Sequence, residues 1–138
     1  MRYIDAPEVE AVARDIMSSL PLIDGIQEAK IKYLFALQKR SEYAGKIQKP
    51  GGVWKFLSDY DYVVLIHKPS WDKFSEKQRE ALVYHELLHI TYKVDKNEEK
   101  RWKLRRHDIE EFINVIKEFG AWSPELNRLK DIFQESGE

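Results

Sequence analysis

Residues 85–89, with the sequence His-Glu-Leu-Leu-His, combine the side-chain types and the spacing of a metal-dependent hydrolytic site. Residues four apart on a helix lie one turn apart on the same face, so the imidazoles of His85 and His89 can reach one ion. Glu86 lies beside that line, where the carboxylate of HExxH enzymes takes a proton from the zinc-bound water. The pattern therefore predicts a zinc site with His85 and His89 as ligands and Glu86 as the catalytic residue.

A third protein ligand is expected, because catalytic zinc usually has three of them and one open position for water. The candidates that follow the motif are His107, Asp108, Glu110 and Glu111. Asp108 is expected to cap the next helix, and His107 lies just before that helix begins. We therefore favour His107 as the third ligand, with Glu110 or Glu111 as the alternative. His67, which ends a predicted strand, is expected to be exposed or locally hydrogen-bonded rather than a ligand.

The helix that carries the motif is predicted by signals that do not depend on the motif itself. Ser75 and Gln78 form a capping box, and the helix is expected to run to about residue 92. Its apolar residues cover much of its circumference, which is typical of a central, buried helix. The alternative to a metal site is a pair of core histidines satisfied by hydrogen bonds. We favour the metal site, because two desolvated imidazoles and a carboxylate are costly in such a helix without an ion.

The residues before this helix predict a first helix and a small antiparallel sheet. Asp5, with Glu8 three residues later, is expected to cap the first helix, and Pro21 stops it. Alternating apolar residues predict a strand over 31–38, and the Pro-Gly-Gly turn at 50–52 is flanked by further candidate strands. These candidates are residues 46–49, 53–58 and 62–67. Residues 62–67 are the candidate edge strand, which could pair with an extended substrate.

After the motif helix, the highly charged residues 93–106 show no clear period and predict an exposed loop. Asp108 with Glu111 opens a third helix that ends at Gly120, and residues 123–125 begin a last one. Both carry apolar residues at helical spacing. Together the elements predict an α+β fold in a single domain, residues 1–138. A sheet of three to four strands packs there with an N-terminal helix, the central motif helix and two C-terminal helices.

Composition limits the class of protein and the kind of metal ligand. The 138 residues include no cysteine, so any metal must be held by His, Asp or Glu. The net charge of −1 draws the chain towards neither nucleic acid nor a membrane. The N-terminus lacks the apolar stretch of a signal peptide, and the longest aliphatic run, residues 63–66, is too short to cross a bilayer. We therefore expect a cytoplasmic protein with no membrane association.

The motif at 85–89 and the segment His-Asp-Ile-Glu-Glu-Phe at 107–112 resemble the putative phage metallopeptidase family. These are small single-domain HExxH proteins of phages and bacterial genomes, and the resemblance extends to the turn at 120–122. It implies a compact zincin-like α+β fold with the motif helix under a small sheet. The chain is also similar to the SprT-like metallopeptidases, in which a His opens a short segment at a similar interval after the motif. That similarity implies His107 as the third ligand.

Three functions are compatible with these observations. The leading one is a zinc metallopeptidase that cleaves a protein or peptide substrate with a water activated by Glu86. The second is a nucleic-acid-associated or regulatory module with a mainly structural zinc site, or a protease targeted to DNA. Its basis is the basic segment 93–106 with Trp102 inside it, because aromatic rings among cations can stack on single strands. The third is a hydrolase that uses the same zinc chemistry on another amide.

Overall fold

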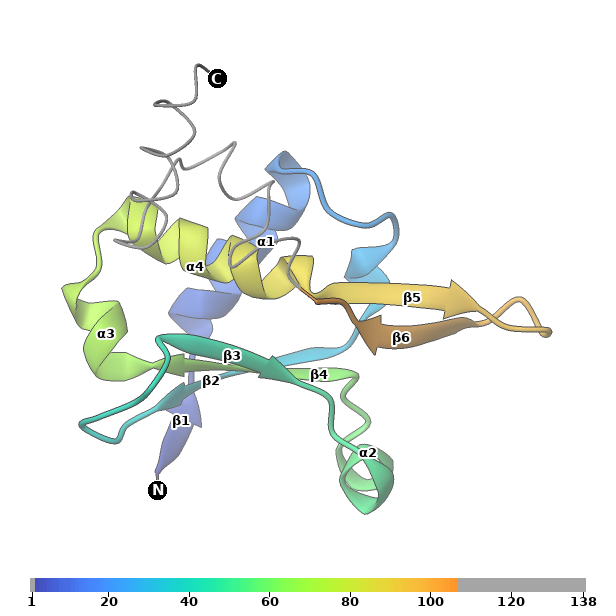
Figure 1. The fold of residues 1–138 in the computed structure, drawn as a ribbon, viewed down its shortest axis with the longest axis horizontal. Helices are drawn as coiled ribbons and strands as arrows, with labels where there is room; N and C mark the ends of the chain where they lie inside the picture. Colours follow the sequence, from blue (N-terminus) through green and yellow to red (C-terminus); the bar gives the residue numbers. More distant parts are fainter. Residues whose placement is uncertain (1, 107–138) are drawn as a thin grey trace, which may run out of the picture.

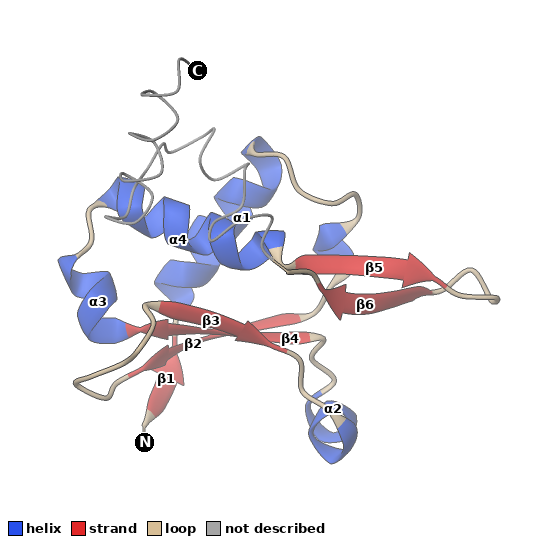
Figure 2. Ribbon diagram, viewed as in Figure 1, coloured by secondary structure: helices blue, strands red, loops and turns tan. Residues whose placement is uncertain are grey.

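A four-stranded sheet with two long helices on one of its faces forms the body of residues 2–106, the part of the chain that the computed structural model describes (Figure 1). A two-stranded hairpin extends from the end of the second long helix (Figure 2). The elements in chain order are β1 (Tyr3–Asp5), α1 (Pro7–Ser19), the short 3-10 helix η1 (Ile26–Glu28), β2 (Ile31–Ala36), β3 (Gly45–Gln48), α2 (Gly52–Ser58), β4 (Tyr62–His67), α3 (Lys68–Lys73), α4 (Glu76–Leu88), β5 (Ile90–Val94) and β6 (Lys100–Leu104). The mixed α+β class is confirmed.

The sheet has the order β1-β2-β4-β3, and it is mixed rather than antiparallel. β2 and β4 run parallel, with Ile31 opposite Tyr62, whereas β1 and β3 are antiparallel to their neighbours. The antiparallel prediction is wrong because β4, whose alternate residues Tyr62, Val64 and Ile66 are fully buried, takes an inner position beside β2. The chain forms the edge strand β3 first and returns through α2. The predicted edge at residues 62–67 is therefore also wrong, and the edges are β1 and β3.

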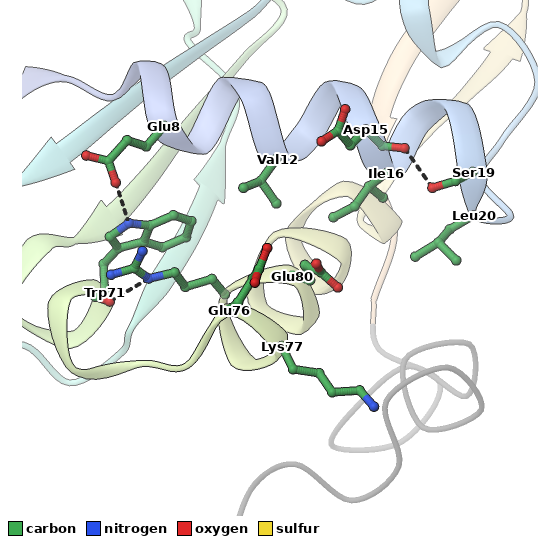
Figure 3. Close-up of a pocket in the computed structure, with 11 residues that line it drawn as sticks. Glu8, Val12, Asp15, Ile16, Ser19, Leu20, Trp71, Glu76, Lys77 and Glu80 are labelled. Atoms are coloured by element: carbon green, nitrogen blue, oxygen red, sulfur yellow. Dashed lines mark hydrogen bonds between the residues drawn. The ribbon is translucent and has the colours of Figure 1, made fainter.

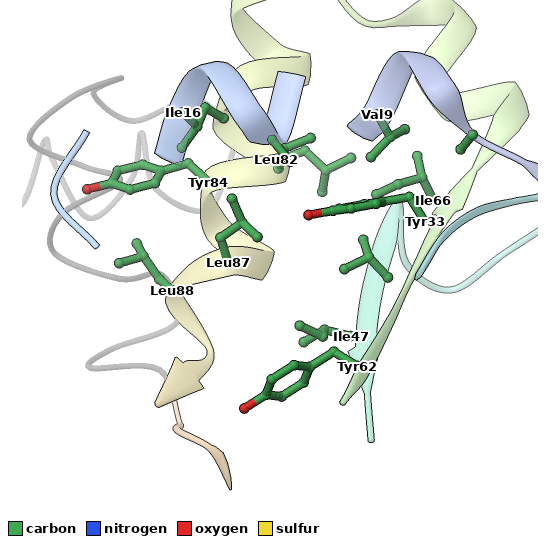
Figure 4. Packing of buried hydrophobic residues seen from close by; sticks show 14 of the residues in the cluster. Val9, Ile16, Tyr33, Ile47, Tyr62, Ile66, Leu82, Tyr84, Leu87 and Leu88 are labelled. Carbon is green, nitrogen blue, oxygen red and sulfur yellow. The ribbon is translucent and has the colours of Figure 1, made fainter. Parts of the chain in front are cut away.

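The core lies between the sheet and the two long helices (Figure 4). Val9 and Ile16 of α1 are buried against it, as the predicted apolar stripe requires. The predicted cap of this helix is wrong. Asp5 belongs to β1 and pairs with Lys32 at 2.8 Å, while Pro7 opens the helix after an uncapped Ala6. Proline tolerates the first helical position because the N–H it lacks would have no partner there.

Residues 53–58 form a helix, α2, and not the predicted strand. Gly51 is extended, and Gly52 and Asp59 have positive φ angles of 52° and 59° at the two ends. Asp59 ends the helix in the left-handed conformation. The prediction was wrong because four of the five residues from Val53 to Leu57 are large and apolar. Such a run has no period by which a strand and a helix can be told apart.

The capping box of α4 is confirmed, since Ser75 Oγ accepts from the Gln78 N–H and the Gln78 side chain accepts from the Ser75 N–H. The helix ends at Leu88, however, and not near residue 92. The β-branched Ile90 and Thr91 begin β5, which pairs with β6 over five residues. The predicted loop at 93–106 is thus mostly a hairpin. Its alternating Lys-Arg-Trp-Lys-Leu at 100–104 was hidden by the density of charge.

Among residues 2–106 no helix has the length and hydropathy that crossing a bilayer requires. The two C-terminal helices that the sequence predicts, from Asp108 and from Ser123, lie outside the described residues and stay predictions.

Candidate metal centre

The last turn of α4 brings His85, Glu86 and His89 together. Their ligand atoms all lie within 4.8 Å of one another, and the two imidazole rings have their centroids 5.3 Å apart at an interplanar angle of 65°. Both histidines are half-buried, and Glu86 is buried with 4 % of its surface exposed. The spacing in the sequence thus produces one compact group of two imidazoles and a carboxylate, a donor set that suits a divalent metal ion.

His89 is oriented by the main chain of Arg105. Its Nδ1 lies 2.7 Å from the Arg105 carbonyl oxygen, and the Arg105 N–H donates to the His89 carbonyl at the same distance. A carbonyl can only accept, so Nδ1 carries the proton and the neutral ring has its lone pair on Nε2. Metal-binding histidines are typically fixed in this way. Sequence reasoning missed Arg105, because a backbone carbonyl leaves no signal in the residue types.

The β5–β6 hairpin that carries Arg105 is held by Tyr62 of β4. The Tyr62 hydroxyl donates to the Lys103 carbonyl at 2.6 Å and lies 3.3 Å from the Thr91 carbonyl, so it touches both strands of the hairpin. Burial raises the pKa of this hydroxyl, which keeps it protonated as the donor. Trp102 packs edge-on against Tyr62 and Tyr92, with ring centroids 6.3 and 5.2 Å away. The hairpin is therefore fixed relative to the sheet and to His89.

Glu86 lies against the start of the edge strand β3. A Cβ atom on Gly45 would be 3.0 Å from Glu86 Oε2, 3.0 Å from Leu82 Cδ1 and 3.1 Å from Ile66 Cδ1. A side chain at this position would therefore be tightly packed, and its neighbours would have to move by a few tenths of an ångström to admit it. Gly45 was also missed by sequence reasoning, although a glycine within a strand is the signal by which such an approach can be found.

Comparison of the whole chain with known proteins identifies its family. The family model described as putative phage metallopeptidase matches residues 1–134. The chain belongs to this family. No curated protein is similar enough to count as a match. Membership in a metallopeptidase family implies hydrolase activity and a metal cofactor, which agrees with the clustering of His85, Glu86 and His89. The similarity to the SprT-like metallopeptidases stays a prediction.

His67 is locally hydrogen-bonded, as the sequence predicts. Its Nε2 lies 2.7 Å from the Gln38 carbonyl and must donate, so its Nδ1 accepts from the Ser70 hydroxyl, also at 2.7 Å. Both ring nitrogens are therefore engaged, and the ring is buried. A metal ligand needs a ring nitrogen with an available lone pair, so His67 is not one in this arrangement.

The predicted third ligand, His107, and its alternatives Glu110 and Glu111 lie outside the described residues. The described chain ends at Arg106, one residue after the hydrogen bonds between Arg105 and His89.

The largest of the described cavities, about 580 Å³, lies between α1, α3 and α4 (Figure 3). His85, Glu86 and His89 do not line it. Trp71 forms part of its wall and donates to Glu8 at 3.2 Å, while Arg79 donates to the Trp71 carbonyl at 2.9 Å. Four acidic side chains and two basic ones line it beside apolar residues of α1. The volume of this cavity therefore gives no measure of the space beside His85, Glu86 and His89.

We expect Gly45→Val to reduce the free energy of unfolding by about 1–3 kcal/mol, because the added side chain overpacks against Glu86 and Leu82. Urea unfolding measures the change. Gly51→Val is the matched control, since a Cβ there meets nothing within 4 Å, and it should cost less. The loss should shrink when Glu86 is already alanine. Equal losses in both backgrounds would contradict the contact with Glu86.

We expect Tyr62→Phe to weaken metal binding by about tenfold, because the hairpin that presents the Arg105 carbonyl to His89 loses its hydrogen bonds to β4. Competition with a chromophoric chelator measures the affinity. Tyr84→Phe is the control, since it also removes a buried phenol-to-carbonyl bond, to Pro21 at 2.8 Å, that does not involve the hairpin. If both variants bound metal as tightly as the wild type, the positioning role of Tyr62 would be wrong.

Proposed function

We propose that this protein is a zinc-dependent endopeptidase of the HExxH type, with His85, His89 and His107 as metal ligands and Glu86 as the general base. The observation that carries the proposal is the orientation of His89. The Arg105 carbonyl holds the proton on Nδ1 and leaves Nε2 as the donor atom, in a cluster whose ligand atoms lie within 4.8 Å. A histidine that only filled the core would not need a carbonyl to fix its ring beside a second imidazole and a carboxylate.

The donor set favours zinc among the divalent ions. Imidazole nitrogens suit zinc, whereas magnesium and calcium take mainly oxygen ligands. The chain has no cysteine, so a site made of four thiolates is impossible. When bound, zinc would polarise the scissile carbonyl and lower the pKa of the attacking water to roughly 7.

Glu86 is the group of this chain that would move the proton. Its carboxylate is adjacent to both histidines and lies in a buried position beside β3. It would accept the proton of the attacking water and then deliver it to the amine that leaves. The low local dielectric strengthens its interaction with any positive charge that develops there. The close approach of Gly45 limits the directions in which the carboxylate can turn.

An extended polypeptide fits this site because of β3. Within the described residues, β3 pairs with β4 on one side only, so its other edge offers unpaired backbone N–H and C=O groups. The strand begins at Gly45, directly beside Glu86. A substrate that added to this edge would pass the catalytic carboxylate with its main chain exposed. This arrangement supports an unfolded or flexible protein segment as the substrate.

His107 is proposed as the third ligand on the basis of chain direction. It follows Arg105 by two residues, and Arg105 is bonded to His89. Two residues of extended chain reach at most about 7 Å, and this short separation from Arg105 supports His107 as the third ligand. Glu110 and Glu111 are three and four residues farther along the sequence.

The hairpin gives less support to the nucleic-acid function. Two of its cations are already paired within the protein. Arg101 binds Asp95 at 2.7 Å, Lys100 binds Glu28, and Lys49 of the neighbouring segment donates to the Trp102 carbonyl. Phosphate binding would compete with these pairs, and Trp102 is packed between two tyrosines rather than presented for stacking. We therefore propose the peptidase function alone.

We expect Glu86→Gln to keep the zinc content of the wild type and to lower the hydrolysis of an unfolded protein substrate by roughly 10²–10⁴-fold, because the amide cannot accept the proton. Plasma mass spectrometry gives the metal content, and appearance of new amino termini gives the rate. Glu80→Gln, on the same helix but at the separate cavity, should leave both unchanged. Unaltered hydrolysis by Glu86→Gln would exclude the mechanism.

We expect His107→Ala to reduce zinc affinity by about 10²-fold or more, since one of three ligands is lost. Glu110→Gln and Glu111→Gln serve as controls and should bind zinc like the wild type. Competition titration of protein purified without a histidine tag measures all three. If His107→Ala bound zinc normally and one of the glutamine variants did not, the site would be of the His-His-Glu type.

A further inference from the structure

The helix α2 exposes its apolar side chains almost completely. None of its seven residues is buried, and four large hydrophobic residues keep 67–85 % of their surface in contact with solvent. These residues, which we call the α2 face, are Val53, Trp54, Phe56 and Leu57. In Figure 1 the helix stands apart from the sheet and the two long helices. Contiguous apolar surface of this kind usually marks an interaction site.

The orientation of α2 is inverted relative to an ordinary surface helix. At about 100° per residue, the α2 face covers an arc of about 160°, and Lys55 lies opposite its centre. Lys55 holds the helix to the body by pairing with Asp61 at 3.1 Å and with Asp59 at 3.7 Å. Asp61 is itself tied to the sheet by accepting from the Lys30 N–H at 2.8 Å. The polar side therefore faces the protein, and the apolar side faces solvent.

The size of the α2 face argues against a stable protein partner. Seven helical residues span roughly 10 Å, whereas a stable protein–protein interface buries about 800 Å² on each side. The cavity beside the helix gives no groove that would extend the face, because α2 contributes only Lys55 to its lining. The face is convex, so it must insert into its partner.

A lipid bilayer meets these conditions. It has no minimum interface area, since each side chain that inserts contributes separately, and Trp and Phe favour the membrane–water boundary. Lys46 of β3, the strand that precedes the helix, is exposed and can contact anionic headgroups. A single-stranded nucleic acid fits less well, because Val53 and Leu57 form half of the face and have no ring to stack on a base.

We propose that the α2 face inserts into the interfacial region of a lipid bilayer and holds the protein at the membrane surface. The expectation of no membrane association rested on net charge and on the length of apolar runs. Neither quantity registers a seven-residue helix with its apolar side outward. The proposal does not depend on the peptidase function.

The test is co-sedimentation of the full-length protein with vesicles of phosphatidylcholine, with and without phosphatidylglycerol. We expect the wild type to bind both, and the anionic vesicles more tightly. Trp54→Ser combined with Phe56→Ser should reduce the partition coefficient by about tenfold or more. Both side chains are exposed, so the double variant should keep the circular dichroism spectrum and thermal unfolding of the wild type. Ile4→Ser combined with Val94→Ser, two exposed hydrophobics on other elements, should bind vesicles like the wild type.

The proposal would be overturned if the wild type bound neither kind of vesicle. It would also be overturned if the Trp54/Phe56 double variant bound vesicles as tightly as the wild type. Sedimentation velocity without lipid tests a second copy as the occupant. A dimer that the same double variant abolishes, with no vesicle binding, would assign the face to self-association. Binding of a single-stranded oligonucleotide through these residues, again without vesicle binding, would assign it to nucleic acid.

Discussion

Two hydrogen bonds between His89 and Arg105 connect the parts of this protein on which its chemistry depends. One joins the imidazole Nδ1 to the Arg105 carbonyl, and the other joins the Arg105 N–H to the His89 carbonyl. They close the β5–β6 hairpin onto the end of α4, they determine which ring nitrogen carries the proton, and they set where the chain leaves towards residue 107. A change in the hairpin register would alter all three at once. The arrangement of His85, Glu86 and His89 therefore depends on α4 and on the hairpin together.

The sheet supports this arrangement from below. β4 is one of the two inner strands, and its first residue, Tyr62, is buried in the core while its hydroxyl reaches both hairpin strands. The edge strand β3 approaches α4 so closely at Gly45 that Glu86 packs against backbone. The same sheet thus positions His89 from β4, through Tyr62 and the hairpin, and contacts Glu86 from β3.

The helix α2 obeys a different constraint from the rest of the fold. α1 and α4 bury their apolar residues against the sheet, and their contacts form the core. α2 turns Lys55 inward to Asp61 and leaves Trp54 and Phe56 in water. An isolated helix of this length is not stable by itself, so the ion pairs and the two residues with positive φ at its ends must hold it. A fold that uses polar contacts to present apolar groups is arranged for a partner outside the chain.

Local patterns in the sequence were sufficient for the parts of the protein whose interactions are local. The capping box at Ser75, the i, i+4 spacing of His85 and His89, and the apolar strand at residues 62–67 each depend on neighbours within a few residues. The sequence could therefore predict the motif, the start of its helix and the clustering of the two histidines. It misassigned α2, where a run of apolar residues hides the helical period, and the hairpin, where dense charge hides the alternation of a strand. It also could not predict the order of the strands in the sheet.

Tertiary structure alone decided the parallel pairing of β2 with β4, the close approach of Gly45 to Glu86 and the role of the Arg105 carbonyl. Each of these joins residues that are at least 16 positions apart. Which segments pair over such separations depends on how much surface all the elements bury together, and no single segment contains that information.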